Sequence, residues 1–122
     1  MKVSELVKEL GLKVHSGEKG LEKEIEGGYV SDLLSDVMGN ADAGMVWVTL
    51  QTHKNVMAIA SLKDLAAVIL VKGLVPDADT AAQSESENIP ILGTRQQAFE
   101  TAGKMYGLIM NKAKKESTTG KL

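Results

Sequence analysis

The sequence predicts an α/β fold, a single three-layer α/β/α domain with a mostly parallel sheet. Residues 66–71 form an unbroken apolar run that ends at Lys72-Gly73, as expected of a strand buried on both faces. Strand and helix patterns then alternate through the second half of the chain, and this order gives right-handed crossovers between parallel strands. A chain of 122 residues is long enough for one domain with its own core. We therefore expect one domain over residues 1–111.

The first third of the chain predicts one helix followed by short extended segments. Apolar residues at helical spacing indicate a helix over residues 3–10, and Gly11 can take the left-handed conformation that ends it. A short strand over residues 12–14 and a turn over residues 16–20 follow. Residues 25–30 form further extended segments around two glycines, which allow a bend or a close backbone approach.

A short second helix is expected to begin near Ser31 and to end at Gly39-Asn40. Ser31 would cap it, and Asp32 would lie in its first turn, where a negative charge suits the helix dipole. Asp32 and Asp36 are four residues apart and would then share a face, as an exposed pair or as an acid–base pair. The inner face of this helix would hold Leu33, Leu34, Val37 and Met38.

The second half predicts three strand–helix units. A strand over residues 45–50, rich in β-branched and aromatic residues, leads through a polar loop to a helix over residues 56–62, which Asn55 would cap. The buried strand of residues 66–71 leads to a helix with an acidic first turn after Pro76. The third unit pairs a short strand over residues 89–92 with a helix over residues 95–111; beyond it, residues 112–122 are expected to be frayed.

The composition excludes several kinds of function. The net charge is −2 with both signs interspersed, and the four aromatic residues do not alternate with basic ones, so we expect no nucleic-acid partner. The absence of cysteine excludes disulfides and thiolate chemistry. The longest apolar run is far shorter than the roughly 20 residues of a membrane span, and the first ten residues lack a secretory pattern, so we expect a cytoplasmic location and no membrane partner.

Three polar loops follow the predicted parallel strands. In open α/β sheets ligands lie beyond the carboxyl ends of the strands, and helix N-termini there offer N–H groups to anions. The candidate ligand-binding residues in these loops are Thr52, His53, Asn55, Lys72, Gly73, Thr94 and Arg95. Each also has a simpler interpretation, as a helix cap or a solvated side chain. Neither His15 nor His53 has partners at metal-ligand spacing, so no metal and no cofactor is expected.

The second half of the chain resembles the DRTGG domain family, and the first half resembles the start of the N-terminal domain of HPr kinase/phosphorylase, which has a similar fold. In the second half the matching pieces are Trp47-Val48-Thr49, Thr52-His53-Lys54-Asn55, Ile69-Leu70-Val71-Lys72-Gly73-Leu74-Val75-Pro76-Asp77 and Ile89-Pro90-Ile91-Leu92-Gly93-Thr94 leading to Ala98-Phe99. In the first half they are Leu10-Gly11-Leu12-Lys13-Val14, Gly17-Glu18-Lys19-Gly20-Leu21, Ile25 and Ser31-Asp32. This chain has His53-Lys54 where the family has Asp-Arg, and Lys72-Gly73-Leu74 where it has Thr-Gly-Gly.

The resemblance implies a non-catalytic accessory domain of the kind attached to phosphotransacetylases and to regulatory pyrophosphatases with CBS domains. We expect a regulatory or ligand-sensing module, not an enzyme, for which a nucleotide or another phosphorylated metabolite would suit the loop residues. The alternative is a protein-interaction subunit that self-associates or docks on a partner enzyme without a small ligand. Both hypotheses predict a homodimer. An enzyme is the third hypothesis, and no nucleophile–base constellation supports it.

Overall fold

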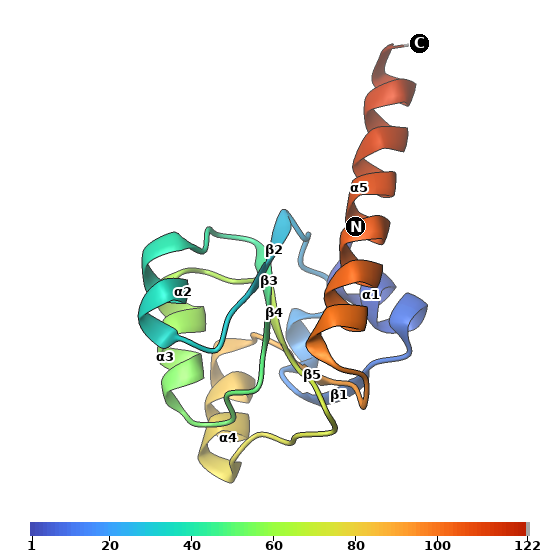
Figure 1. The fold of residues 1–122 in the computed structure, drawn as a ribbon. Helices are drawn as coiled ribbons and strands as arrows, with labels where there is room; N and C mark the ends of the chain where they lie inside the picture. Colours follow the sequence, from blue (N-terminus) through green and yellow to red (C-terminus); the bar gives the residue numbers. More distant parts are fainter. Residues whose placement is uncertain (122) are drawn as a thin grey trace.

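The computed structural model describes the backbone of residues 1–121 and the side chains of residues 1–112. One five-stranded sheet has the order β1-β5-β4-β3-β2 (Figure 1). Strands β2 to β5 are parallel, and β1 runs antiparallel to β5. The strands are β1 (Lys13–Ser16), β2 (Gly27–Val30), β3 (Met45–Thr49), β4 (Ala67–Leu70) and β5 (Ile91–Gly93).

Helices cover both faces of this sheet. In Figure 1, α2, α3 and α4 lie on one side of it, and α1 and α5 on the other. The helices are α1 (Val3–Leu10), the 3₁₀ turn η1 (Glu18–Gly20), α2 (Leu34–Asn40), α3 (Asn55–Leu62), α4 (Ala78–Glu87) and α5 (Ala98–Lys121). The predicted three-layer α/β/α fold with a mostly parallel sheet is confirmed. Helix α5 continues to Lys121, ten residues beyond its predicted end at Asn111. The side chains from residue 113 on lie outside the described residues, and the expected fraying of residues 112–122 stays a prediction.

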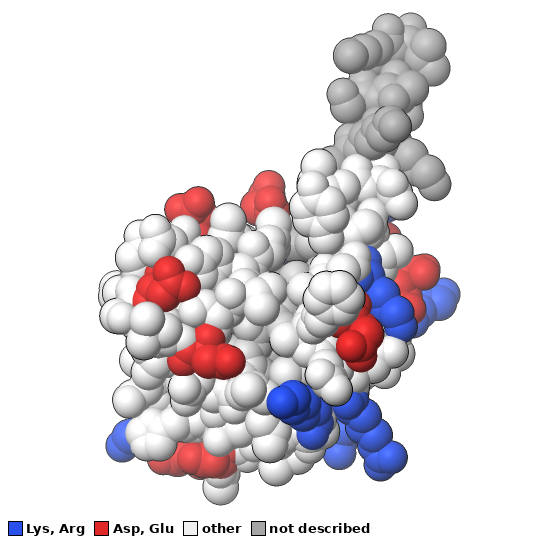
Figure 2. Space-filling view, viewed as in Figure 1, with Lys and Arg blue, Asp and Glu red and all other residues white. Residues whose placement is uncertain are grey.

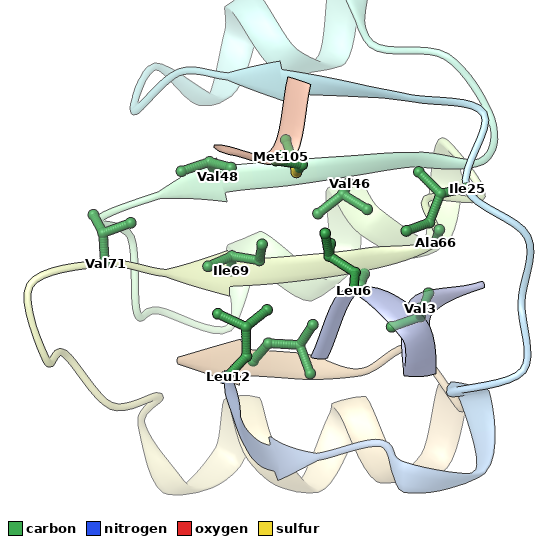
Figure 3. Packing of buried hydrophobic residues seen from close by; sticks show 12 residues of the cluster. Val3, Leu6, Leu12, Ile25, Val46, Val48, Ala66, Ile69, Val71 and Met105 are labelled. Atoms are coloured by element: carbon green, nitrogen blue, oxygen red, sulfur yellow. The ribbon is translucent and has the colours of Figure 1, made fainter. Parts of the chain in front are cut away.

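Strand β4 lies at the centre of the sheet, and all four of its residues are buried. Successive side chains of a strand point to opposite faces, so this strand contributes to two separate cores. Ala67 and Ile69 pack with Val3 and Leu6 of α1 and Met105 of α5, and Figure 3 shows this cluster. The alternate residues of β4, Val68 and Leu70, pack against α3 on the other face. The apolar run therefore serves both layers, as the sequence predicted.

The predicted position of Asp32 is wrong. Helix α2 begins at Leu34 with Leu33 at its N-cap, so Asp32 precedes the helix and shares no face with Asp36. The Asp32 carboxylate instead accepts hydrogen bonds from Thr49 Oγ1 (2.9 Å) and from the Leu50 backbone N–H (2.7 Å). It thereby satisfies donors at the carboxyl end of β3, which the sequence pattern of α2 could not reveal.

Three further details of the predicted helices are wrong. Leu33 and Met38 are exposed at 64% and 37%, so Val37 and Leu34 alone face the core from α2. Asn55 is the first residue of α3 and not its cap, and its N–H donates to His53 Nδ1 (3.3 Å). Helix α5 begins at Ala98, three residues after the predicted start. Such shifts of one to three residues are usual at helix ends, where local caps compete.

Candidate functional site

The connections after β4 and β5 leave the sheet on opposite sides. The chain turns from β4 to α4 on one face and from β5 to α5 on the other (Figure 1). Neighbouring parallel strands whose connections diverge in this way leave a crevice beyond their carboxyl ends. The connections after β2 and β3 lead to α2 and α3 on the same side as α4, so no such divergence occurs there. The topology therefore selects the space between the β4–α4 and β5–α5 loops.

A cavity of about 540 Å³ lies at this position. Its walls come from both loops, from the end of α1 and from the start of β1. The lining residues are Leu10, Gly11, Lys13, His15, Gly73, Leu74, Val75, Gly93, Thr94, Arg95 and Gln96. Three of them, Lys13, His15 and Arg95, carry basic groups, and none carries a carboxylate. We call this the basic cavity, and its electrostatics favour an anionic occupant.

Backbone hydrogen bonds tie the two loops of the basic cavity to each other. The Gly73 N–H donates to Thr94 O (2.8 Å), and the Lys72 N–H donates to Gln96 O (2.9 Å). To make these contacts Lys72 and Gly73 both take positive φ, of 59° and 72°. Gly73 adopts this region freely, whereas Lys72 bears strain that the surrounding contacts must compensate. These hydrogen bonds hold the two loops together at the cavity wall.

Strand β1 brings two basic residues into the cavity from the other end of the sequence. Lys13 is the register partner of Gly93 in the antiparallel β1–β5 pair. The His15 ring lies directly over Gly93, because a Cβ at that position would collide with His15 Nε2. Glycine at residue 93 thus makes room for the imidazole at the edge of the cavity.

Burial lowers the pKa of His15 below its ordinary value of 6.5, and the positive charge of Lys13 lowers it further. The folded protein therefore binds fewer protons at this site than the unfolded chain does. Stability from the neutral imidazole is complete above pH 6.5 and is lost as the pH falls below 6.5 toward the folded pKa. We expect the unfolding free energy of the wild type to decline over that window more steeply than that of His15→Gln. Urea titrations of both proteins from about pH 7.5 to pH 5 measure this difference, and parallel curves would contradict it.

The seven predicted site residues do not all lie in one place in the structure. Gly73, Thr94 and Arg95 line the basic cavity. Lys72 lines a smaller neighbouring cavity of about 200 Å³, together with Asp32 and Phe99.

The three residues of the β3–α3 loop line neither of these cavities. Thr52 O accepts the Asp77 N–H (3.1 Å), and His53 Nδ1 accepts the Asn55 N–H. These hydrogen bonds therefore join residues within the β3–α3 connection to each other and to the start of α4. A ligand role for Thr52, His53 and Asn55 stays a prediction.

Lys13 and His15 were not among the predicted site residues. The sequence placed them on or beside a short strand, but it held no sign that this strand pairs with β5.

Figure 2 shows Lys and Arg side chains gathered at the lower right of one face, below the start of α5, while Asp and Glu are more widely spread. Among the residues that the structure describes, no group of three His, Asp or Glu side chains could hold a metal ion.

The fold has a counterpart among solved structures. A Clostridium perfringens crystal structure holds the CBS and DRTGG domains of a pyrophosphatase regulatory region in complex with its activator, diadenosine tetraphosphate. It superposes with a TM-score of 0.62 at 12% sequence identity. The match covers 82% of this chain and 44% of that one, so this chain spans less than half of that structure. The likeness shows a related fold. No family model and no curated protein matches the sequence.

Proposed function

We propose that this chain is a non-catalytic regulatory module that binds a nucleotide or another phosphorylated metabolite in the basic cavity. The observation that carries the proposal is a cavity of about 540 Å³, at the divergence of β4 and β5, with three basic side chains and no carboxylate in its lining. A volume of this size suits a nucleotide, since small-molecule sites occupy roughly 300–1,000 Å³. The related fold of a regulatory region that binds diadenosine tetraphosphate supports it.

The cavity lining suits phosphate recognition better than chemistry. The planar guanidinium of Arg95 can donate two parallel hydrogen bonds to a phosphate, and Lys13 adds a point charge. His15 becomes a further donor when an anion nearby favours its protonated form. Thr94 is the one hydroxyl in the lining, and its Oγ1 already accepts the Gln96 N–H (3.2 Å). The lining is thus rich in hydrogen-bond donors for an anion, which supports a sensing role.

The proposal includes a cytoplasmic homodimer that belongs to the DRTGG family and acts on a partner enzyme. Over the described residues, every helix is too short or too polar to cross the membrane.

The alternative, a self-associating interaction subunit without a small ligand, is favoured by one specific observation. Phe99 and Tyr106 are large apolar side chains, and they are exposed at 87% and 67%.

Thermal unfolding with added ligands tests the proposed function. We expect ATP, diadenosine tetraphosphate or inorganic pyrophosphate to raise the Tm, by on the order of 10 °C at about 100 times Kd. Adenosine is the matched control, because it keeps the base and ribose but lacks phosphate, and it should leave the Tm unchanged. A Tm that no phosphorylated compound moves would overturn the ligand-sensing function and would favour the interaction subunit.

A further inference from the structure

Helix α5 carries apolar residues on two of its faces. Ala98, Met105 and Leu108 pack against the core of the sheet. A second row, spaced at seven and four residues, holds Phe99, Tyr106 and Met110, which are exposed at 87%, 67% and 48%. Positions with this spacing lie on one side of a helix. A helix with apolar residues on so much of its circumference is normally covered on both sides.

Two glycines lie within the exposed row. Gly103 and Gly107 are one helical turn apart, and a Cβ added at either would meet nothing within 4 Å in the described part of the chain. Glycine weakens a helix interior relative to alanine, so these two positions carry a cost that no contact among the described residues explains. Small residues four apart allow a second helix backbone to approach closely.

A groove adjoins the same side of α5. It has a volume of about 400 Å³ and lies between α5 and β2, which is the edge strand of the sheet. Its walls include Gly27, Val30, Met45, Ala102 and Tyr106. Val30 is half exposed, so the apolar surface continues from α5 onto the edge strand. We call the row on α5 together with this groove the α5 face.

We propose that the α5 face is the surface on which a second copy of this chain docks, with the two α5 helices crossing at Gly103 and Gly107. This rests on the homodimer in the proposed function and names its interface. Phe99 and Tyr106 together with the half-exposed Met110 and Val30 present on the order of 450 Å² of apolar surface. That is more than half of the ~800 Å² that each partner buries in a standard interface, before the groove walls are counted.

The charge of the row on α5 is compatible with a second copy of the chain as the partner. A two-fold contact sets the same surface against itself, so a charged surface would repel its own copy. Phe99, Tyr106 and Met110 carry no charge, and the nearest charged residues are Glu100, on the side of the two glycines, and Lys104. The flanking Glu100 and Lys104 have opposite signs and are four residues apart. The row on α5 is thus uncharged. Glu26 is the one charged residue in the groove wall, and Lys104 beside the row has the opposite sign.

Sedimentation equilibrium of the full chain tests the proposal. We expect a dimer for the wild type and at least a 100-fold weaker dimer for the Gly103→Leu/Gly107→Leu double variant. Leucine is a better helix former than glycine and meets open space in one chain, so the double variant should fold, which circular dichroism verifies. Gly39→Leu makes the same substitution on α2, where an added side chain also meets open space, and it should dimerise like the wild type.

The possible results separate the interface from the wider function. A wild type that stays monomeric at about 0.5 mM would overturn both the homodimer and this interface. A double variant that dimerises as tightly as the wild type would overturn the α5 face and leave the homodimer standing. A wild type that forms only a complex with a different protein would overturn docking of a second copy. Nucleotide-induced thermal shifts of the double variant should equal those of the wild type, because the basic cavity is unchanged.

Discussion

Reversal of charge in the basic cavity is expected to abolish nucleotide binding. Arg95→Glu removes a guanidinium donor and places a carboxylate in the lining of the cavity. A charge-assisted hydrogen bond is worth about 1.5–3 kcal/mol, which is roughly 10- to 150-fold in affinity, and the new carboxylate also repels phosphate. We therefore expect ATP to bind about 100-fold more weakly. The double variant Lys13→Glu/Arg95→Glu should show no binding by isothermal titration calorimetry. Both side chains are exposed, so neither change should unfold the domain.

Lys54→Glu is the matched control for this experiment. It changes the net charge by the same amount as Arg95→Glu, and it lies in the β3–α3 loop, outside the lining of both cavities. We expect its ATP affinity to stay within about threefold of the wild type at a fixed salt concentration near 0.15 M. A loss as large as that of Arg95→Glu would show that binding depends on general charge or on the β3–α3 loop, and it would contradict the basic cavity as the site.

Truncation of Trp47 should have the largest effect on stability. The side chain is fully buried in the core between β3 and helices α2 and α3, and its Nε1–H donates to Ser31 O (2.7 Å). Loss of a buried tryptophan typically costs about 3–5 kcal/mol, through lost burial and the cavity left behind. Domains have only about 5–15 kcal/mol of stability in total, so Trp47→Ala should be close to unfolded at 37 °C.

Trp47→Phe separates the hydrogen bond from the packing. It keeps an aromatic ring but leaves Ser31 O without its donor, so we expect a smaller loss of about 1–3 kcal/mol. Trp47 is the only tryptophan, so urea unfolding should be followed by circular dichroism and not by fluorescence. A cost below about 1 kcal/mol for Trp47→Ala would contradict its place in the core.

Local patterns predicted most of the fold. The apolar run that contains β4 and the helical spacing of α1 and α5 are properties of neighbouring residues, and the structure has all three elements in place. Pairing between distant segments leaves no such pattern. The antiparallel β1–β5 pair joins residues about 80 positions apart in the register of Lys13 with Gly93. It could not be predicted from either strand alone.

The difference between local patterns and long-range pairing also explains which cavity residues could be predicted. Gly73, Thr94 and Arg95 followed from the rule that ligands lie at the carboxyl ends of parallel strands. That rule also selected Thr52, His53 and Asn55, because the sequence did not show that the connections after β3 and β4 leave on the same side of the sheet. Lys13 was missed for the opposite reason, since it enters the cavity from the amino end of an antiparallel strand.

The proposed function depends on where the ligand binds, and amide chemical-shift mapping with diadenosine tetraphosphate and ATP locates that position. ¹⁵N-labelled wild-type protein should show its largest shifts at the amides of the β4–α4 and β5–α5 loops and of β1, with Gly73, Gly93 and Arg95 among them. Weaker shifts should occur in α2 and in the β3–α3 loop. Largest shifts around His53 and Asn55, or no shifts with either nucleotide, would contradict a nucleotide site in the basic cavity.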